Sequence, residues 1–223
     1  MRHIDKGCEP EYLTEHKDKW LEAFLENIKM HPNDKKYKRP DSKKYAHPKI
    51  FDALWCASNG KCFYCECSLD GKNKEVDHFI EVAEREDLAF DWNNLNLSCD
   101  QCNNKRPNKD IPVDKVLDPC KDSDEEIQRC ITFDNEIMYE NNDSEKGRLT
   151  IQKFNLNSQL QQLRRAKFLN RIKDAVLSFC KSNGLKSLSD NEKEQLRSLA
   201  YRTRQYSYMV EVYLKNQLPE IFK

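Results

Sequence analysis

Apolar residues near the start of the chain recur with the spacing of a helix. They lie mostly three or four positions apart over residues 10–30, which predicts an amphipathic helix there. A second helix is predicted from Pro48, a residue suited to a first helical turn, to the stop signal Asn59-Gly60. Residues 33–47, between the two, are basic and irregular. They predict a linker, with a phosphate-binding loop as the alternative.

The middle of the chain carries a strand-like pattern. Residues 61–82 predict a β-hairpin, with its turn at Asp70-Gly71 and its second strand over residues 75–82. After a polar loop, a short helix is predicted over residues 99–105. A hairpin followed by a helix predicts a small ββα unit.

Helices are predicted again at the end of the chain. Residues 107–147 are rich in Pro, Asp and Glu and lack a long period, so we expect loops there, with room for one short strand pair. Residues 157–182 predict a helix whose apolar face includes Leu160 and Leu163. One further helix is predicted from the capping box at residues 189–192 through Tyr213.

These elements predict an α+β fold. The expected centre is the ββα unit within residues 61–120, wrapped by a helical segment over 1–60 and by a segment over 121–223 that begins with loops and ends with helices. A length of 223 residues suits one large domain or two small ones.

The composition favours an ordered protein that does not enter a membrane. Aromatic residues make up 10% of the chain, which argues against disorder, although charged residues reach 34% and mean hydropathy is −0.94. No leader and no apolar run of about 18 residues is seen, so we expect a soluble, cytoplasmic protein. In a reducing cytosol, close pairs among the ten cysteines indicate metal ligands or redox sites.

Charge is unevenly distributed, although the net charge is zero. Residues 1–150 carry 24 Lys and Arg against 32 Asp and Glu, and residues 151–223 carry 14 against 6. The basic end of the chain is either a solvated helical surface or a contact for phosphates or an acidic partner.

Four cysteines have the spacing of a zinc site. Cys62-x-x-Cys65 is followed, after 33 intervening residues, by Cys99-x-x-Cys102. Two such pairs supply four thiolates to one tetrahedral Zn²⁺ at about 2.3 Å and leave no position for water, so the site is predicted to be structural. Cys67 is close enough in sequence to replace Cys65, and this alternative stays open.

With the residues between them, the cysteines resemble the HNH endonuclease motif. The matching elements, in order, are Cys62/Cys65, Asp77-His78, Asn94-Leu95 and Cys99/Cys102-Asn103. The resemblance covers about residues 61–109. It implies a ββα-metal fold of treble-clef-like form, in which the hairpin and helix hold one divalent ion, and it implies hydrolysis of phosphodiester bonds.

The resemblance assigns roles to three residues of this motif. It makes His78 the general base, for which an ordinary pKa near 6.5 is suited at neutral pH. It makes Asp77 and Asn103 ligands of a catalytic Mg²⁺ or Mn²⁺, with open positions for phosphate and water. In many members of the family the position of Asn103 is His, so the preference for a particular ion stays open.

Three further residues are assigned on the same basis. Asn94 is expected to orient the ring of His78 or its loop. Lys105 and Arg106 follow the ligand helix and are candidates to hold the substrate backbone, or else are solvated charges.

Flanking segments narrow the resemblance. "IPVDKVLDPCKD" and "GRLTIQKFNLNSQLQQLRRAK" look like the HNH nuclease subunits of Septu and retron antiphage systems, which work beside an ABC-type ATPase. The implied substrate is DNA, with RNA, including transfer RNA, as the alternative. The competing hypothesis is a zinc-finger adaptor of an ATPase complex that binds nucleic acid or protein without cutting.

The charge around the motif does not resemble that of a free-standing nuclease. Residues 75–150 carry 20 acidic and 9 basic residues, whereas phosphate backbones attract basic grooves. We therefore hypothesise that substrate binding needs the C-terminal helices, the basic residues of segment 35–44, or another subunit.

Overall fold

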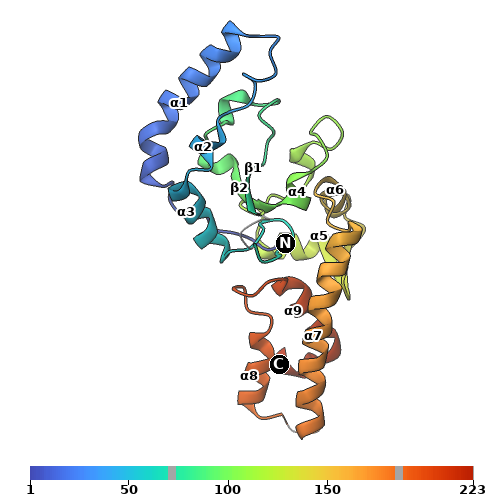
Figure 1. The fold of residues 1–223 in the computed structure, drawn as a ribbon. Coiled ribbons are helices and arrows are strands. Elements are labelled where there is room, and N and C mark those ends of the chain that lie inside the picture. Colours follow the sequence, from blue (N-terminus) through green and yellow to red (C-terminus); the bar gives the residue numbers. More distant parts are fainter. Residues whose placement is uncertain (70–73, 184–187, 223) are drawn as a thin grey trace.

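The computed structural model describes residues 1–69, 74–183 and 188–222. Figure 1 shows helices from both ends of the chain around a small central sheet. Within the described residues, no helix combines the length and the apolar character needed to cross a bilayer. The predicted turn at Asp70-Gly71 lies outside the described ranges.

The two N-terminal helices are confirmed. Helix α1 spans Glu11–Met30 and helix α3 spans Pro48–Ser58. Helix α3 ends at Asn59, which adopts the left-handed conformation typical of a helix stop. The predicted linker contains one further turn of helix, α2 (Ser42–Tyr45), which is capped by the side chain of Asp41.

The central sheet corrects the predicted hairpin. Strand β1 (Lys74–His78) pairs antiparallel with β2 (Leu95–Cys99), and α4 (Asp100–Asn103) follows β2 directly. The partner of β1 is therefore a later segment that we expected only to lead into the helix. The residues before β1 contribute only an isolated bridge, between Lys61 and Ser68, within the described range.

Local hydrogen bonding explains both differences. The backbone between Cys62 and Cys67 closes on itself, since the amide of Cys62 donates to the carbonyl of Cys67 at 2.9 Å, so it is not free to pair with β1. Strand β1 also ends at His78 rather than at the predicted Val82. The amide of Phe79 still donates to the carbonyl of Asn94 at 2.8 Å, but the amide of Asn94 donates to the carbonyl of Asp91 at 2.9 Å, so the pairing goes no further.

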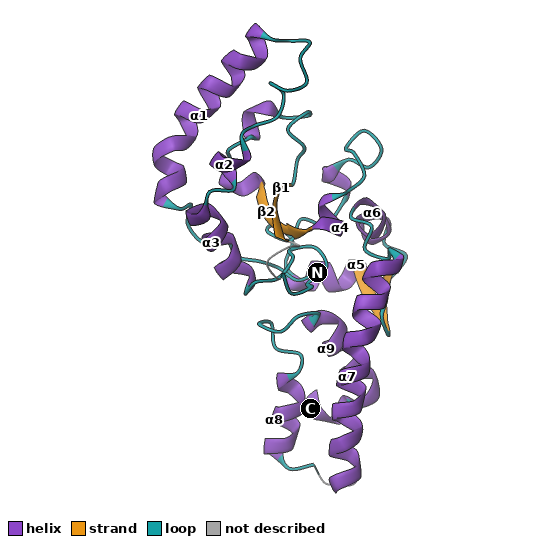
Figure 2. Cartoon of the chain, viewed as in Figure 1, coloured by secondary structure: helices purple, strands orange, loops and turns teal. Residues whose placement is uncertain are grey.

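The loop-rich region after the motif is more ordered than predicted. The expected strand pair is present as β3 (Ile131–Asp134) and β4 (Ile137–Glu140). Helices α5 (Asp124–Cys130) and α6 (Glu145–Lys153) flank this pair and were not predicted. Figure 2 shows the two strand pairs apart from each other, the first beside α4 and the second beside α5.

The C-terminal helices follow the prediction in part. Helix α7 spans Gln159–Asn183, and the predicted capping box opens α8 (Asp190–Ser198). The predicted last helix is divided, however, because α9 (Ser207–Gln217) begins after a break at Tyr206, whose backbone is left-handed with φ of 53°. The amide of Tyr206 donates to the carbonyl of Glu66 at 3.0 Å, so a contact with a distant turn interrupts the helix.

The core surrounds the cysteine-containing turn. Phe63 and Tyr64 are fully buried, and the ring of Tyr64 stacks on Phe154 with centroids 4.1 Å apart. Short 3-10 turns occur at Glu86–Leu88, Trp92–Asn94, Val113–Lys115 and Pro219–Phe222.

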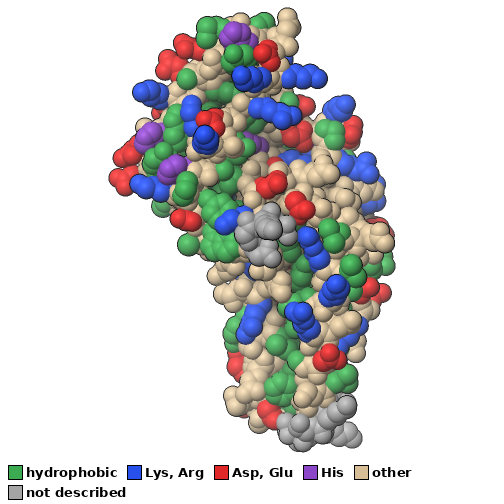
Figure 3. Space-filling view, viewed as in Figure 1, with side chains coloured by type: hydrophobic (Ala, Val, Ile, Leu, Met, Phe, Trp, Pro, Cys, Tyr) green, Lys and Arg blue, Asp and Glu red, His purple; other side chains and the backbone are tan. Residues whose placement is uncertain are grey.

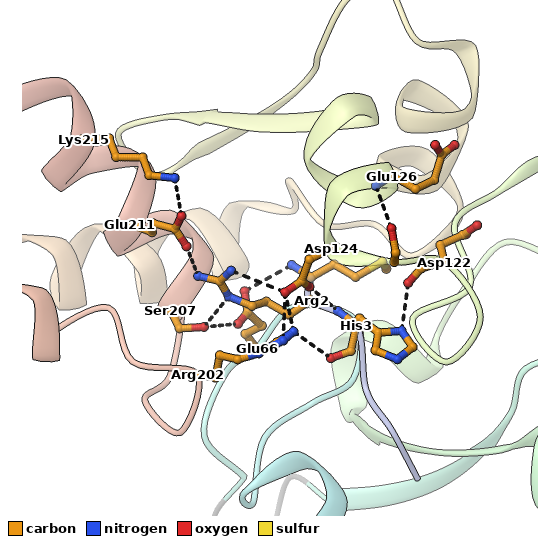
Figure 4. Close-up of polar contacts among 12 residues, drawn as sticks. Arg2, His3, Glu66, Asp122, Asp124, Glu126, Arg202, Ser207, Glu211 and Lys215 are labelled. Carbon is orange, nitrogen blue, oxygen red and sulfur yellow. Dashed lines mark hydrogen bonds and ion pairs between the residues drawn. The ribbon is translucent and has the colours of Figure 1, made fainter. Parts of the chain in front are cut away.

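An ionic network joins the chain start, the cysteine-containing turn and α9 (Figure 4). At its centre is the buried carboxylate of Glu66, which accepts from the amino group of Met1 at 3.2 Å and from the hydroxyl of Ser207 at 2.7 Å. Arg2 binds the same hydroxyl and also pairs with Glu211 of α9. These contacts hold the turn against two segments that are far from it in the sequence.

Candidate active site and metal centre

The four predicted zinc ligands come together in one buried cluster. The sulfur atoms of Cys62, Cys65, Cys99 and Cys102 all lie within 4.8 Å of one another, and the sulfur atoms of Cys65 and Cys99 are 3.8 Å apart. Tetrahedral ligands about 2.3 Å from a zinc ion are about 3.8 Å from each other. The donor set and its spacing therefore fit a structural zinc ion, and Cys67 is not part of this set.

Helix α7 closes one side of the cluster with a residue that we did not predict. The side-chain amide of Gln161 is buried and donates towards the sulfur atoms of Cys102, at 3.4 Å, and Cys99, at 3.7 Å. Such hydrogen bonds fix the orientation of thiolate ligands and stabilise their charge.

A signal for this contact is present in the sequence. Gln161 and Arg165 are fully buried and share the helical face of buried Leu169, whereas Leu160 and Leu163, which we placed on the apolar face, are exposed. The prediction of that face was therefore wrong in its first turns, because the two polar residues have buried partners. Polar residues in phase with the apolar face of a helix indicate such partners.

His78 lies at the end of β1 with a defined ring orientation. Its Nε2 lies 2.9 Å from the carbonyl oxygen of Ala89, and since a carbonyl only accepts, Nε2 carries the hydrogen. The neutral ring then has its lone pair on Nδ1. The ring of Tyr45, from α2, lies edge-on to the imidazole with centroids 4.6 Å apart. Burial lowers the pKa of His78, against the opposing effects of the Ala89 hydrogen bond and the Asp77 charge.

Asp77 points into the protein, and its carboxylate is engaged on both oxygens. Tyr64 donates to it at 2.6 Å, and the ammonium of Lys105 lies 2.7 Å from each oxygen. The side chains of Asp77 and Lys105 are only 6% and 5% exposed. The same ammonium contacts the carbonyl of His78, so Lys105 binds the strand on which His78 lies.

Asn94 is buried and connects the two segments that position His78. Its side-chain oxygen accepts from the amide of Ile80 at 2.7 Å, and its side-chain nitrogen donates to the carbonyls of Ile80 and Leu88 at 3.0 and 3.2 Å. Ile80 follows His78 closely, and Leu88 precedes Ala89, the residue that binds the imidazole.

The two predicted ligands of a catalytic ion are not brought together by any contact within the described residues. The amide nitrogen of Asn103 donates to the carboxylate of Glu75, and Asp77 is paired with Lys105. Apart from the cysteines, the described residues contain no group of three or more His, Cys, Asp and Glu arranged to hold a metal ion. As these side chains lie, they do not fit a divalent ion, and the predicted Mg²⁺ or Mn²⁺ stays a prediction.

The two predicted substrate-binding residues differ in their setting. Lys105 is directed inward, as described above, so its ammonium does not face solvent. Arg106 is exposed, and its backbone amide donates to the carbonyl of Lys153 at 2.8 Å. Of the two, only Arg106 is placed where a substrate reaches it.

Comparison with known families identifies the central part of the chain. The sequence model of the HNH endonuclease family matches residues 62–109, the region that holds the cysteine cluster, β1, β2 and α4. The chain therefore contains an HNH endonuclease domain, as its sequence predicted.

A longer stretch of the chain is similar to Septu protein PtuB of Bacillus thuringiensis. The two sequences are 31% identical over 125 residues, which is 55% of this chain and 44% of that protein. The chain thus spans less than half the length of this relative. The match supports the Septu-like resemblance that the sequence motifs predicted.

Proposed function

We propose that this chain is a nuclease that hydrolyses phosphodiester bonds, with His78 as the general base. The observation that carries the proposal is the setting of His78 in the HNH domain: the bond from Nε2 to Ala89 leaves Nδ1 to accept a proton. Because burial lowers its pKa, the imidazole is neutral at neutral pH, as a general base must be.

In the proposed reaction, Nδ1 of His78 takes a proton from a water molecule. The water oxygen attacks phosphorus, the bond from phosphorus to the leaving sugar oxygen breaks, and that oxygen takes a proton from solvent. The charge of Asp77 favours the imidazolium that forms. Asn94 is a positioning residue, since it holds the two segments that orient the ring.

The similarity to Septu protein PtuB supports a role in antiphage defence. We propose that the chain is the cytoplasmic effector of a complex with an ABC-type ATPase. DNA is the first expected substrate and RNA, including transfer RNA, is the second. Arg106 is proposed to hold the substrate backbone because its side chain is exposed beside α4.

A cleavage assay tests the proposal. Labelled DNA and RNA are incubated with the chain and Mg²⁺ or Mn²⁺, with and without the candidate ATPase, and wild type is compared with His78→Ala. His16→Ala, a histidine on α1 that is 40% exposed, is the matched control. We expect cutting by wild type and by the control only. Equal cutting by His78→Ala would remove His78 from the mechanism. If wild type does not cut even with the ATPase, the result would favour the alternative function, a zinc-finger adaptor that binds without cutting.

A further inference from the structure

A basic pocket adjoins His78 and is lined in part by residues from outside the HNH domain. Its volume is about 550 Å³, and it lies between the α1–α2 connection and the end of β1. Its lining includes Lys35, Lys38, Arg39, Ser42, Tyr45 and His78. The proposed general base thus shares one pocket with three cationic side chains from a segment far away in the sequence.

The three cations are free to bind a ligand. Lys35, Lys38 and Arg39 are exposed, and none of them forms an ion pair with any residue that the structure describes. Figure 3 shows Lys and Arg side chains over this upper part of the molecule. In contrast, Lys105 in the HNH domain is already paired with Asp77. Exposed cations that have no ion-pair partner are available to attract the phosphates of a nucleic acid.

A second pocket continues this surface towards α4. Its volume is about 570 Å³, and it shares Ser42 and Tyr45 with the basic pocket, so the two adjoin at α2. Lys74 and Asn103 line it as well, together with the carboxylates of Asp52 and Glu75. A chain of nucleotides that lies in both pockets passes across α2 and the end of β1.

We propose that Lys35, Lys38 and Arg39 bind the phosphodiester backbone of the strand to be cut and place a neighbouring phosphate at His78. This inference rests on the proposed nuclease function. It assigns the predicted linker the role of a substrate-binding segment. Lysine and arginine contacts to phosphates carry no base information, so the segment should contribute equally to all sequences.

Binding without cleavage tests this inference. In a His78→Ala background, the full chain is titrated with a labelled single strand of roughly 20 nucleotides, longer than one typical site, in separate DNA and RNA arms. Lys35, Lys38 and Arg39 are changed to Gln singly and together, and affinity is measured as a function of salt. Lys36→Gln is the matched control, because Lys36 is exposed on the same segment but does not line the pocket.

The expected result is a lower affinity and a shallower dependence on salt. Each phosphate contact with a single strand contributes about 0.7 to the slope of log K against log salt, so the triple variant should lose about 2. We expect it to bind roughly ten- to a hundredfold more weakly at physiological salt, with Lys36→Gln close to the parent. The nucleic acid, DNA or RNA, whose affinity falls more in the triple variant is the preferred strand.

The two proposals fail in different ways. If the triple variant keeps the affinity and the salt slope of its parent, the role of this segment is refuted, whatever His78 does. If His78→Ala still cuts while the triple variant loses binding, the general base is wrong and the phosphate-binding segment stands. Because the three residues are exposed, we expect the variants to fold normally. The zinc content and circular dichroism spectrum of each variant check this.

Discussion

Removing one buried charge at the cysteine-containing turn should destabilise the whole chain. Glu66 lies between the candidate zinc ligand Cys65 and Cys67, and its side chain is 4% exposed. Burial opposes its ionisation, but the chain's amino group, Arg2, Lys61 and the hydrogen bond from Ser207 outweigh this effect. They lower the pKa of the carboxyl from 4.5 to about 2.

The size of the effect follows from this pKa. A fall from 4.5 to about 2 corresponds to about 3 kcal/mol of extra stability of the ionised form in the folded chain, at about 1.4 kcal/mol per pH unit. Glu66→Gln keeps the shape of the side chain and removes its charge, which leaves the amino group of Met1 without its counterion. We therefore expect a loss of about 3 kcal/mol at pH 7, within the range found when one partner of a buried ion pair is removed.

Urea unfolding of the zinc-loaded chain measures this loss. Glu84→Gln, at an exposed position outside the network, is the matched control and should change stability by less than about 0.5 kcal/mol. Because the folded pKa is depressed, the advantage of wild type over Glu66→Gln is complete above pH 4.5 and declines as the pH falls towards 2. A loss at pH 7 no larger than that of the control would refute this account of the network.

Three further predictions concern other parts of the molecule. Gly147→Ala in α6 should lower the free energy of unfolding, measured in urea, by about 1–3 kcal/mol, because the added Cβ would lie 1.9 Å from the carbonyl oxygen of Cys130. Alanine usually favours a helix, so a stabilised variant would contradict this packing. Gln161→Leu should weaken zinc binding roughly tenfold or more in a chelator competition, whereas the exposed Gln159→Leu should not. As the pH is lowered, the rate of cleavage should fall with a midpoint below pH 6.5, because burial lowers the pKa of His78 and the protonated ring cannot act as a base. A midpoint above pH 6.5 would exclude His78 as the general base.

Signals carried by short stretches of sequence were read correctly. The spacing of Cys62, Cys65, Cys99 and Cys102 predicted a cluster that the structure contains. Apolar spacing placed α1, and Pro48 and Asn59-Gly60 placed the start and the end of α3. Each of these features depends on residues within a few positions of one another or on the strict geometry of a metal site.

The errors arose where distant segments decide the local structure. All five residues of β2 are buried, so Asn96 and Ser98, which resemble a lead into a helix, lie instead in a strand beneath other parts of the chain. Asn96 donates to the hydroxyl of Tyr64, which binds Asp77. The break between α8 and α9 likewise depends on the bond from Tyr206 to Glu66. Periodicity contains no information about such partners.

Counting charges along the sequence does not show which of them face the site. Residues 75–150 carry an excess of acids, but Asp77 is matched by Lys105, and Glu81 lies 3.5 Å from the buried ammonium of Lys153. Asp77 and Glu81 are therefore paired with cations within the protein. The unpaired cations of the α1–α2 connection lie in the pocket of His78. A nucleic acid backbone that approaches His78 thus meets a more positive surface than the composition of the HNH domain alone predicts, and this difference is why the α1–α2 connection is the place to look for substrate binding.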